Sequence, residues 1–248
     1  MTSEEILLDT DRGYHISCLD GGIAGQKAVI LCLHGFKGNK RSRMIERLHQ
    51  EMEGSDIGTF TFDWPAHGES DAAFSDLNVP NCIKDLEQIY DHVSEKYKVP
   101  VWCFATSFGG FLAMIYHQSR PQAFGKIMLR SPALKMGQVM TNAMDRKKYD
   151  DFMNGAAIDF GKDQPLILTR AFYDSICQYD IYDEPPAFPE RIRIIHGDRD
   201  DLVPPEDSIG YAERYGITLH LLSNATHYYD NPGDAEWVMR EAAEFFNG

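Results

Sequence analysis

The residues whose types could together carry out catalysis are a serine, a histidine and several aspartates that stand far apart in the chain. Ser107 lies in the run FATSFGG, between an apolar segment and a helical one. A serine hydroxyl is a poor nucleophile at neutral pH unless a histidine removes its proton and a buried carboxylate orients that histidine. Serine is also a common helix cap, so its presence before a helix does not by itself indicate a nucleophile. Whether Ser107 is one depends on whether a histidine and an acid can reach it.

The pentapeptide around Ser107 almost matches the nucleophile elbow Gly-x-Ser-x-Gly. Small residues are needed two places before and after the serine, because the sharp turn brings the strand and helix backbones close together. Gly109 meets this need, whereas Ala105 adds one methyl group that a slightly wider approach accommodates. Taken alone, the pentapeptide leaves a nucleophile and a helix-capping serine equally open.

Partners for Ser107 are present further along the chain. His227 lies in SNATHYYDNPGD, after the last predicted strand, and the run HGDRDDLVPPE follows the strand before it. That run supplies Asp198, Asp200 and Asp201 as candidate carboxylates. Loops at the carboxyl edge of a parallel sheet meet, so these side chains are expected to reach Ser107.

The elements that must position these residues alternate between short apolar runs and helical patterns, which is typical of a parallel α/β sheet. Two early runs, 4–10 and 14–20, alternate apolar and polar residues and predict an antiparallel edge hairpin. Helices are predicted over 79–97, with Asn78 as cap, after Ser107, and over 234–246. The predicted core strands are 28–36, 58–64, 101–107, 126–133, 191–197 and 218–223.

Four separated motifs give a resemblance to a known family: LHGFKGN, DWPAHGES, FATSFGG, and HGDRDDLVP together with ATHYY. In these motifs the candidate serine, aspartate and histidine follow one another along the chain in that order. In both respects the chain resembles the α/β-hydrolase superfamily. The resemblance implies an α/β fold: a mostly parallel eight-stranded sheet with helices on both faces and an inserted cap. The core is then 1–133 and 187–248, and residues 134–186, which interrupt the alternation, form the cap.

The resemblance also implies roles for individual residues. Ser107 is the expected nucleophile, His227 the base, and Asp200 the orienting acid, because it stands three residues after the glycine and before x-x-Val-Pro. The backbone N–H groups of Phe36 and Phe108 are the expected oxyanion hole. His34 and His67 match family positions that are usually structural.

The chain is similar to small bacterial carboxylesterases, a group that includes the cinnamoyl and feruloyl esterases and the monoacylglycerol lipases. A small-molecule ester is therefore the expected substrate, and neither a metal nor an organic cofactor is needed. One alternative is a peptidase of the prolyl-aminopeptidase type, with Asp150, Asp151 or Glu184 recognising a free amino terminus. Another is a non-catalytic ligand-binding protein. Arg130 is interpreted as an ordinary surface residue, with binding of a substrate carboxylate as the alternative.

Composition narrows the remaining possibilities. The formal net charge of −14 argues against nucleic acid as a partner. No run approaches the roughly 20 apolar residues of a membrane span, and the acidic N-terminus does not resemble a signal peptide. Five scattered cysteines predict reduced thiols, a cytoplasmic location and no zinc site. The oligomeric state stays open.

The cap contains several aromatic residues that could stack on a phenolic acyl group, although filling the core of the cap is the favoured interpretation. These residues are Tyr149, Phe152, Phe160, Phe172, Tyr173, Tyr179 and Tyr182.

Overall fold

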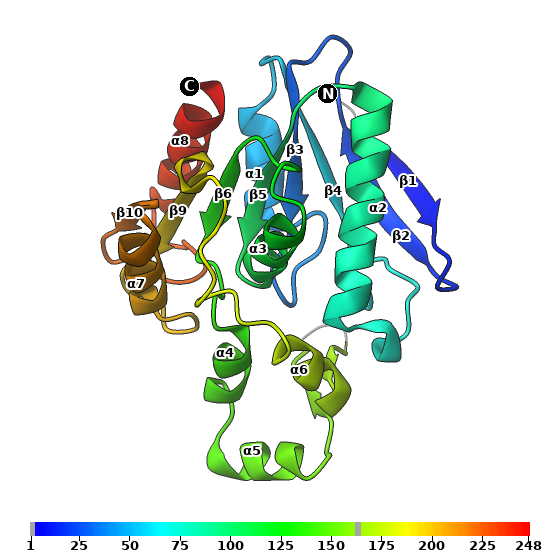
Figure 1. The fold of residues 1–248 in the computed structure, drawn as a ribbon, viewed down its shortest axis with the longest axis vertical. Coiled ribbons are helices and arrows are strands. Elements are labelled where there is room, and N and C mark those ends of the chain that lie inside the picture. The colour runs from blue at the N-terminus through cyan, green and yellow to red at the C-terminus, as the bar shows by residue number, and fades with distance from the viewer. Residues whose placement is uncertain (1–2, 162–164) are drawn as a thin grey trace.

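An eight-stranded sheet forms the centre of the protein and carries helices on both faces (Figure 1). The structure is a computed structural model that describes residues 3–161 and 165–248, so residues 1–2 of the predicted core and 162–164 of the predicted cap lie outside the described residues. The strand order is β1-β2-β4-β3-β5-β6-β9-β10. These strands are β1 (Glu4–Asp9), β2 (His15–Gly21), β3 (Ala28–Leu33), β4 (Ile57–Phe62), β5 (Val101–Thr106), β6 (Ile127–Arg130), β9 (Ile192–Gly197) and β10 (Thr218–Leu222).

The pairing of the strands agrees with the sequence patterns. β1 is antiparallel to β2, and β2 is antiparallel to β4, while all other neighbours in the sheet are parallel. The predicted edge hairpin and the six predicted core strands are all present. The predicted fold class, a mostly parallel eight-stranded sheet with helices on both faces, is confirmed.

The two faces of the sheet carry separate apolar layers. All six residues of β3 are buried, because successive side chains point to opposite faces and both faces are covered. Val29, Leu31 and Leu33 join one layer, and Ile30 and Cys32 join the other. The first layer packs against α2 (Val79–Tyr97), α3 (Phe108–Ser119) and α7 (Pro205–Tyr215), and the second against α1 (Arg43–Glu51) and α8 (Asp234–Asn247).

The predicted helix over 79–97 is confirmed as α2. The Asn78 side chain accepts a hydrogen bond from the backbone N–H of Asn81 (2.9 Å), which satisfies one of the free donors at the helix start. Short 3₁₀ helices lie at Phe74–Asp76 and Pro189–Arg191. In the described part of the chain, no helix combines the length and apolar character that crossing a membrane requires.

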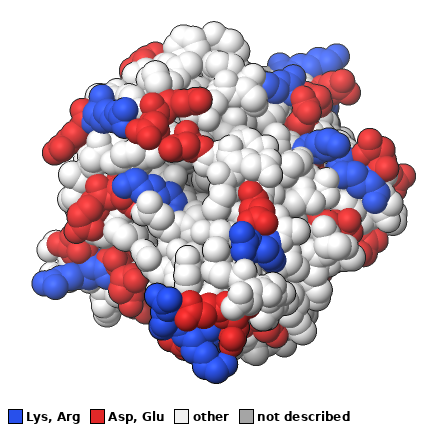
Figure 2. Space-filling model, turned by 60° about the horizontal axis from the view of Figure 1, so that its bottom comes forward, with Lys and Arg blue, Asp and Glu red and all other residues white. Residues whose placement is uncertain are grey.

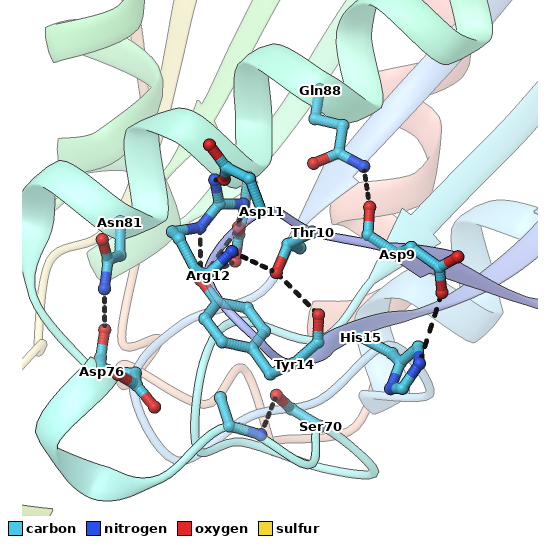
Figure 3. Close-up of polar contacts among 12 residues, drawn as sticks. Asp9, Thr10, Asp11, Arg12, Tyr14, His15, Ser70, Asp76, Asn81 and Gln88 are labelled. Atoms are coloured by element: carbon cyan, nitrogen blue, oxygen red, sulfur yellow. Dashed lines mark hydrogen bonds and ion pairs between the residues drawn. The ribbon is translucent and has the colours of Figure 1, made fainter.

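The turn of the edge hairpin is fixed to α2 by polar contacts. The Arg12 guanidinium and the Tyr14 hydroxyl both donate hydrogen bonds to the buried carboxylate of Asp85 on α2. Burial raises the pKa of Asp85 to about 6, although both donors favour its ionised form. Gln88, further along α2, donates to the backbone carbonyl of Asp9 (2.7 Å), as Figure 3 shows. The hairpin is therefore attached to the helix as well as to the sheet.

Between β6 and β9 the chain leaves the sheet and forms a small group of elements at one end of the molecule, at the bottom of Figure 1. Phe152 and Phe172 are buried and belong to the first apolar layer, the one that contains α2, α3 and α7. This group of elements therefore packs on the rest of the protein through aromatic residues. The elements are α4 (Met136–Asn142), α5 (Arg146–Met153), the antiparallel pair β7 (Ile158–Asp159) and β8 (Ile167–Leu168), and α6 (Arg170–Ile176).

The first turn of α3 lies against the end of β3 with no space for a side chain. A Cβ atom on Gly109 would lie 2.5 Å from the carbonyl oxygen of Leu33 and 2.7 Å from that of His34. Both are backbone atoms, so the obstruction cannot be relieved by a rotamer change. Ala105 is fully buried in β5, and its methyl group is accommodated.

We predict that Gly109→Ala forces α3 away from β3 and lowers the free energy of unfolding by about 1–3 kcal/mol. Urea denaturation measures this change. Gly137→Ala is the matched control, because a Cβ there meets only the Cys177 side chain at 3.3 Å and Ile176 at 4.0 Å. It should be neutral or stabilising, since alanine favours helix over glycine. Equal effects of the two substitutions would contradict the prediction.

Candidate active site

Ser107 stands at the sharp turn between β5 and α3 and has an unusual backbone conformation. Its φ is 53° and its ψ is −114°, a region that non-glycine residues rarely occupy. Three backbone hydrogen bonds fix this turn: Ser107 N–H donates to Arg130 (3.0 Å), and Ser107 C=O accepts from Phe111 (3.2 Å) and Ala133 (3.1 Å). Strain of this kind persists where the surrounding structure over-determines the backbone.

The two N–H groups predicted to bind an oxyanion flank Ser107. Phe108 is the first residue of α3, so its N–H has no acceptor within the helix. In the part of the chain that the structure describes, neither this N–H nor that of Phe36 donates a hydrogen bond to the protein. A Cβ on Gly35 would lie 3.2 Å from the Cβ of Ser107, which places the loop with Phe36 directly beside the serine.

His34 holds this loop in place. The backbone N–H of Trp64 donates to His34 Nε2 (3.1 Å), so the ring proton is on Nδ1, which donates to the carbonyl of Gly35 (2.8 Å). The indole N–H of Trp64 donates in turn to the His34 carbonyl (2.9 Å). Burial lowers the pKa of His34 to about 4, so the ring is neutral at pH 7.

Asp200 and His227 form a buried hydrogen-bonded pair. His227 Nδ1 donates to Asp200 Oδ2 over 2.7 Å, and Asp200 Oδ1 accepts from the backbone N–H groups of Leu202 (3.0 Å) and Val203 (2.8 Å). Burial by itself raises the pKa of Asp200, but these hydrogen bonds and that from His196 hold the pKa well below its usual value. A carboxylate that stays ionised can keep the His227 ring in one tautomer, with Nε2 free to accept a proton.

A second histidine contacts the same carboxylate. His196 Nε2 lies 3.1 Å from both Asp200 Oδ2 and the carbonyl of Val203, so Nε2 carries the proton, and Nδ1 accepts from Ser208 Oγ (2.8 Å). The other two candidates for the acid that orients His227 lie at the surface. Asp198 is exposed and accepts a hydrogen bond from the backbone of Asn224 (2.6 Å), and Asp201 is exposed.

The interpretation of Arg130 as a surface residue is wrong. The side chain is only 7% exposed, at the end of β6. Its Nη1 donates to the carbonyl of His227 (3.0 Å), its Nε donates to Thr106 Oγ1 (3.3 Å), and the guanidinium lies 5.0 Å from the ring centre of Tyr229. Arg130 thus connects the residue before the serine with the loop that carries the histidine.

Ser107 and His227 line one cavity of about 410 Å³, a size typical of small-molecule sites. No hydrogen bond joins Ser107 Oγ to His227 among the described residues. A long or absent contact of this kind is common in sites without a bound substrate. Among the described residues, the lining includes one face of α4, the start of α1 and apolar side chains from loops: Met44, Ile45, Met136, Val139, Met140, Ala143, Phe160, Leu202 and Val203.

The aromatic residues predicted in the cap contribute less to this cavity than α4 does. Of them, only Phe160 lines it in the described part of the chain, and Phe152 and Phe172 are buried in the apolar layer. The apolar residues of α4 were not identified from the sequence. Their spacing at i, i+3, i+4 and i+7 (Met136, Val139, Met140 and Ala143) is an amphipathic signal that identifies this face.

Comparison with known proteins agrees with the resemblance to α/β-hydrolases and with the observed fold. The model of a family described as serine aminopeptidase, S33, matches residues 24–158. Human monoglyceride lipase is 31% identical over 110 residues, which is 43% of this chain and 35% of the lipase. The matched region thus spans about a third of the length of the curated relatives.

Similarity to solved structures extends over almost the whole chain. Est1E from Butyrivibrio proteoclasticus, solved with ferulic acid bound, has a TM-score of 0.81 and 19% identity, covering 97% of each chain. A putative hydrolase from Agrobacterium vitis S4 has a TM-score of 0.83 and 16% identity, covering 98% of each chain. At these identities the similarity shows the fold alone.

We predict that the strain at Ser107 makes glycine more stable than alanine at this position. Ser107→Gly and Ser107→Ala both remove the hydroxyl, so the difference in their free energies of unfolding isolates the backbone effect. Glycine should be favoured by about 1 kcal/mol or more. At Ser119, in the last turn of the same helix, the order should reverse, because glycine disfavours helix. Alanine being equal or better at position 107 would contradict the strain.

We also predict that acid destabilises the fold through buried neutral histidines. Burial lowers the pKa of His34 to about 4 and that of His67 to about 3, whereas both titrate near 6.5 when unfolded. Below pH 6.5 the unfolded chain binds protons that the native state does not, so stability falls as the pH decreases. Each group contributes about 1.4 kcal/mol per pH unit.

His67→Phe tests this linkage, because it keeps a ring of similar size and removes one titrating group. The slope of unfolding free energy against pH, measured by urea denaturation between pH 6 and 4.5, should decrease by about 1.4 kcal/mol per pH unit. An unchanged slope would rule out the contribution of His67, whatever the overall stability of the variant.

Proposed function

The chain belongs to the serine aminopeptidase S33 family and has the α/β-hydrolase fold, and on this basis we propose that it is a serine hydrolase that cleaves carboxylic esters. The observation that carries the proposal is that His227, which is hydrogen-bonded to the buried carboxylate of Asp200, lines the same cavity as a serine on a strained strand-to-helix turn. A protein that only binds a ligand has no need for a nucleophile with base and orienting acid.

In the proposed acylation step, Ser107 Oγ attacks the ester carbonyl carbon while His227 Nε2 removes the hydroxyl proton. The C=O π pair moves to the carbonyl oxygen, whose negative charge is bound by the N–H groups of Phe36 and Phe108. The tetrahedral intermediate collapses with cleavage of the C–O bond. His227 then returns the proton to the leaving alcohol, and the acyl group remains on Ser107.

Water completes the proposed cycle. His227 Nε2 removes a proton from a water molecule, whose oxygen attacks the acyl-enzyme carbonyl in the same oxyanion site. The second tetrahedral intermediate releases the acid, and Ser107 Oγ recovers its proton from His227. Throughout, Asp200 accepts the Nδ1 proton in a hydrogen bond and stabilises the imidazolium form, so it need not be protonated itself.

The family description leaves an aminopeptidase as the second candidate, and the charges around the cavity favour the esterase. An aminopeptidase needs an acid that binds the free ammonium group. Asp150 pairs with Arg146 and Asp151 with Lys147 along α5, and Glu184 is exposed. Among the described residues, no aspartate or glutamate lines the cavity with Ser107.

Two further expectations belong to this proposal. Residues 134–186 act as a cap, in which the apolar face of α4 contributes to substrate binding beside Ser107. The five free thiols, four of them buried, fit a reducing compartment, so we propose a cytoplasmic location.

We predict that short 4-nitrophenyl esters are hydrolysed and aminoacyl-naphthylamides are not, in an assay of both classes at pH 7.5. Ser107→Ala should abolish ester hydrolysis and labelling by a fluorophosphonate probe. Asp200→Asn should lower kcat about 10⁴-fold, because the imidazole tautomer is no longer fixed.

Ser119→Ala is the matched control, since it removes a hydroxyl from the other end of α3 and should retain wild-type activity. Turnover of the naphthylamides in preference to the esters would favour the aminopeptidase. Absence of both turnover and labelling in the folded wild-type protein would favour the non-catalytic alternative.

A further inference from the structure

The cavity at Ser107 has a charge composition opposite to that of the whole chain. The chain contains 38 acidic and 24 basic residues. The described residues that line the cavity nevertheless include Lys37, Arg43 and Arg130 and no aspartate or glutamate. Figure 2, in which the bottom of the molecule comes forward, shows acidic and basic side chains mixed over the surface. The absence of acids is therefore a local property of the cavity.

Arg130 is the most informative of these three cations, because it is almost fully buried and its hydrogen-bond partners are neutral, while Asp200 acts on it only through space. Its hydrogen bonds go to a threonine hydroxyl and a backbone carbonyl, and within the described residues it forms no ion pair with a carboxylate. A guanidinium has five N–H donors, and two of them donate hydrogen bonds to described residues. Removing such a cation from water is costly unless an anion compensates it.

The position of Arg130 places this charge beside the end of the strand that leads to Ser107. In the register of β5 and β6, Arg130 is the direct partner of Thr106, the residue before Ser107. β3, which leads to Phe36, lies on the other side of β5. The oxyanion donor and the buried cation thus flank the serine from opposite sides.

The second arginine lies on the same side as the first. Arg43 Nη2 donates to the carbonyl of Tyr229 (2.6 Å), and Arg130 Nη1 donates to that of His227. Both cations are held by the loop that carries the catalytic base. An anionic group of the substrate that binds them would lie on the histidine side of Ser107.

We propose that the natural substrate is an ester that carries a carboxylate within a few bonds of the scissile carbonyl, and that Arg130 binds this carboxylate. The planar guanidinium offers paired N–H donors that match a carboxylate. The inference rests on the proposed ester hydrolysis, because it specifies the substrate class of that same site. The 410 Å³ cavity and its apolar walls suit a small substrate with one charged end.

The test compares isosteric pairs of esters that differ only in charge. Monomethyl succinate against methyl succinamate places the carboxylate on the acyl side, and 3-acetoxybenzoate against 3-acetoxybenzamide places it on the leaving-group side. We expect at least one pair to show a preference of about tenfold or more in kcat/KM for the anion, as a charge-assisted hydrogen bond provides. The preferred pair identifies the side of the ester that carries the charge.

Arg130→Gln should reduce this preference to about one. The ratio within a pair is the readout, since any disturbance of His227 affects both members of the pair equally. Arg120→Gln removes the same charge at the exposed far end of α3 and should retain the wild-type ratio. A ratio unchanged in Arg130→Gln would overturn the role of Arg130.

Binding to Ser107→Ala separates this inference from the proposed function, because it needs no turnover. Isothermal titration should show tighter binding of the anionic member of the preferred pair, and loss of the difference in Ser107→Ala/Arg130→Gln. Equal binding and equal kcat/KM within both pairs would overturn the inference while ester hydrolysis stands. Hydrolysis of no ester, with anion-selective binding retained, would contradict the esterase and support the anion site.

Discussion

The backbone turn at Ser107 is the constraint on which the rest of the site depends. Its strained conformation is held by hydrogen bonds from both the β6 side and the first turn of α3, so the sheet itself fixes where the hydroxyl lies. The same turn leaves the Phe108 N–H without an acceptor among the described residues and brings Gly35 against the serine. The close approach of Gly109 to β3 completes the arrangement, because a larger residue would separate helix and strand.

Asp200 and His227 are positioned differently, by hydrogen bonds that satisfy the buried Asp200 carboxylate. Asp200 accepts hydrogen bonds from two backbone N–H groups and from both His196 and His227. Each donor favours the ionised form, so burial does not neutralise the group. The charge of Asp200 in turn keeps the His227 proton on Nδ1. The loop after β9 thereby fixes the tautomer of a histidine on another loop.

Much of this arrangement could be predicted from the sequence, because it follows from local patterns. Apolar runs identified the strands, Asn78 marked the start of α2, and the motif spacing selected Asp200, which the structure pairs with His227. Arg130 was misjudged because arginine is usually exposed, and only the three-dimensional packing shows what covers it. The residues that line the cavity also could not be assigned from the sequence, because α4 is short. The face of α4 that lies toward Ser107 is set by the packing of residues 134–186, which the sequence does not show.

The unequal charge of the cavity has a consequence for the last step of the proposed ester hydrolysis. Ester hydrolysis always generates a carboxylic acid, which is ionised at neutral pH, whatever the substrate was. A cavity with cations and no described acid attracts this product after the bond has been cleaved. For the proposed hydrolase we therefore expect accumulated acid product to compete with fresh substrate for the cavity.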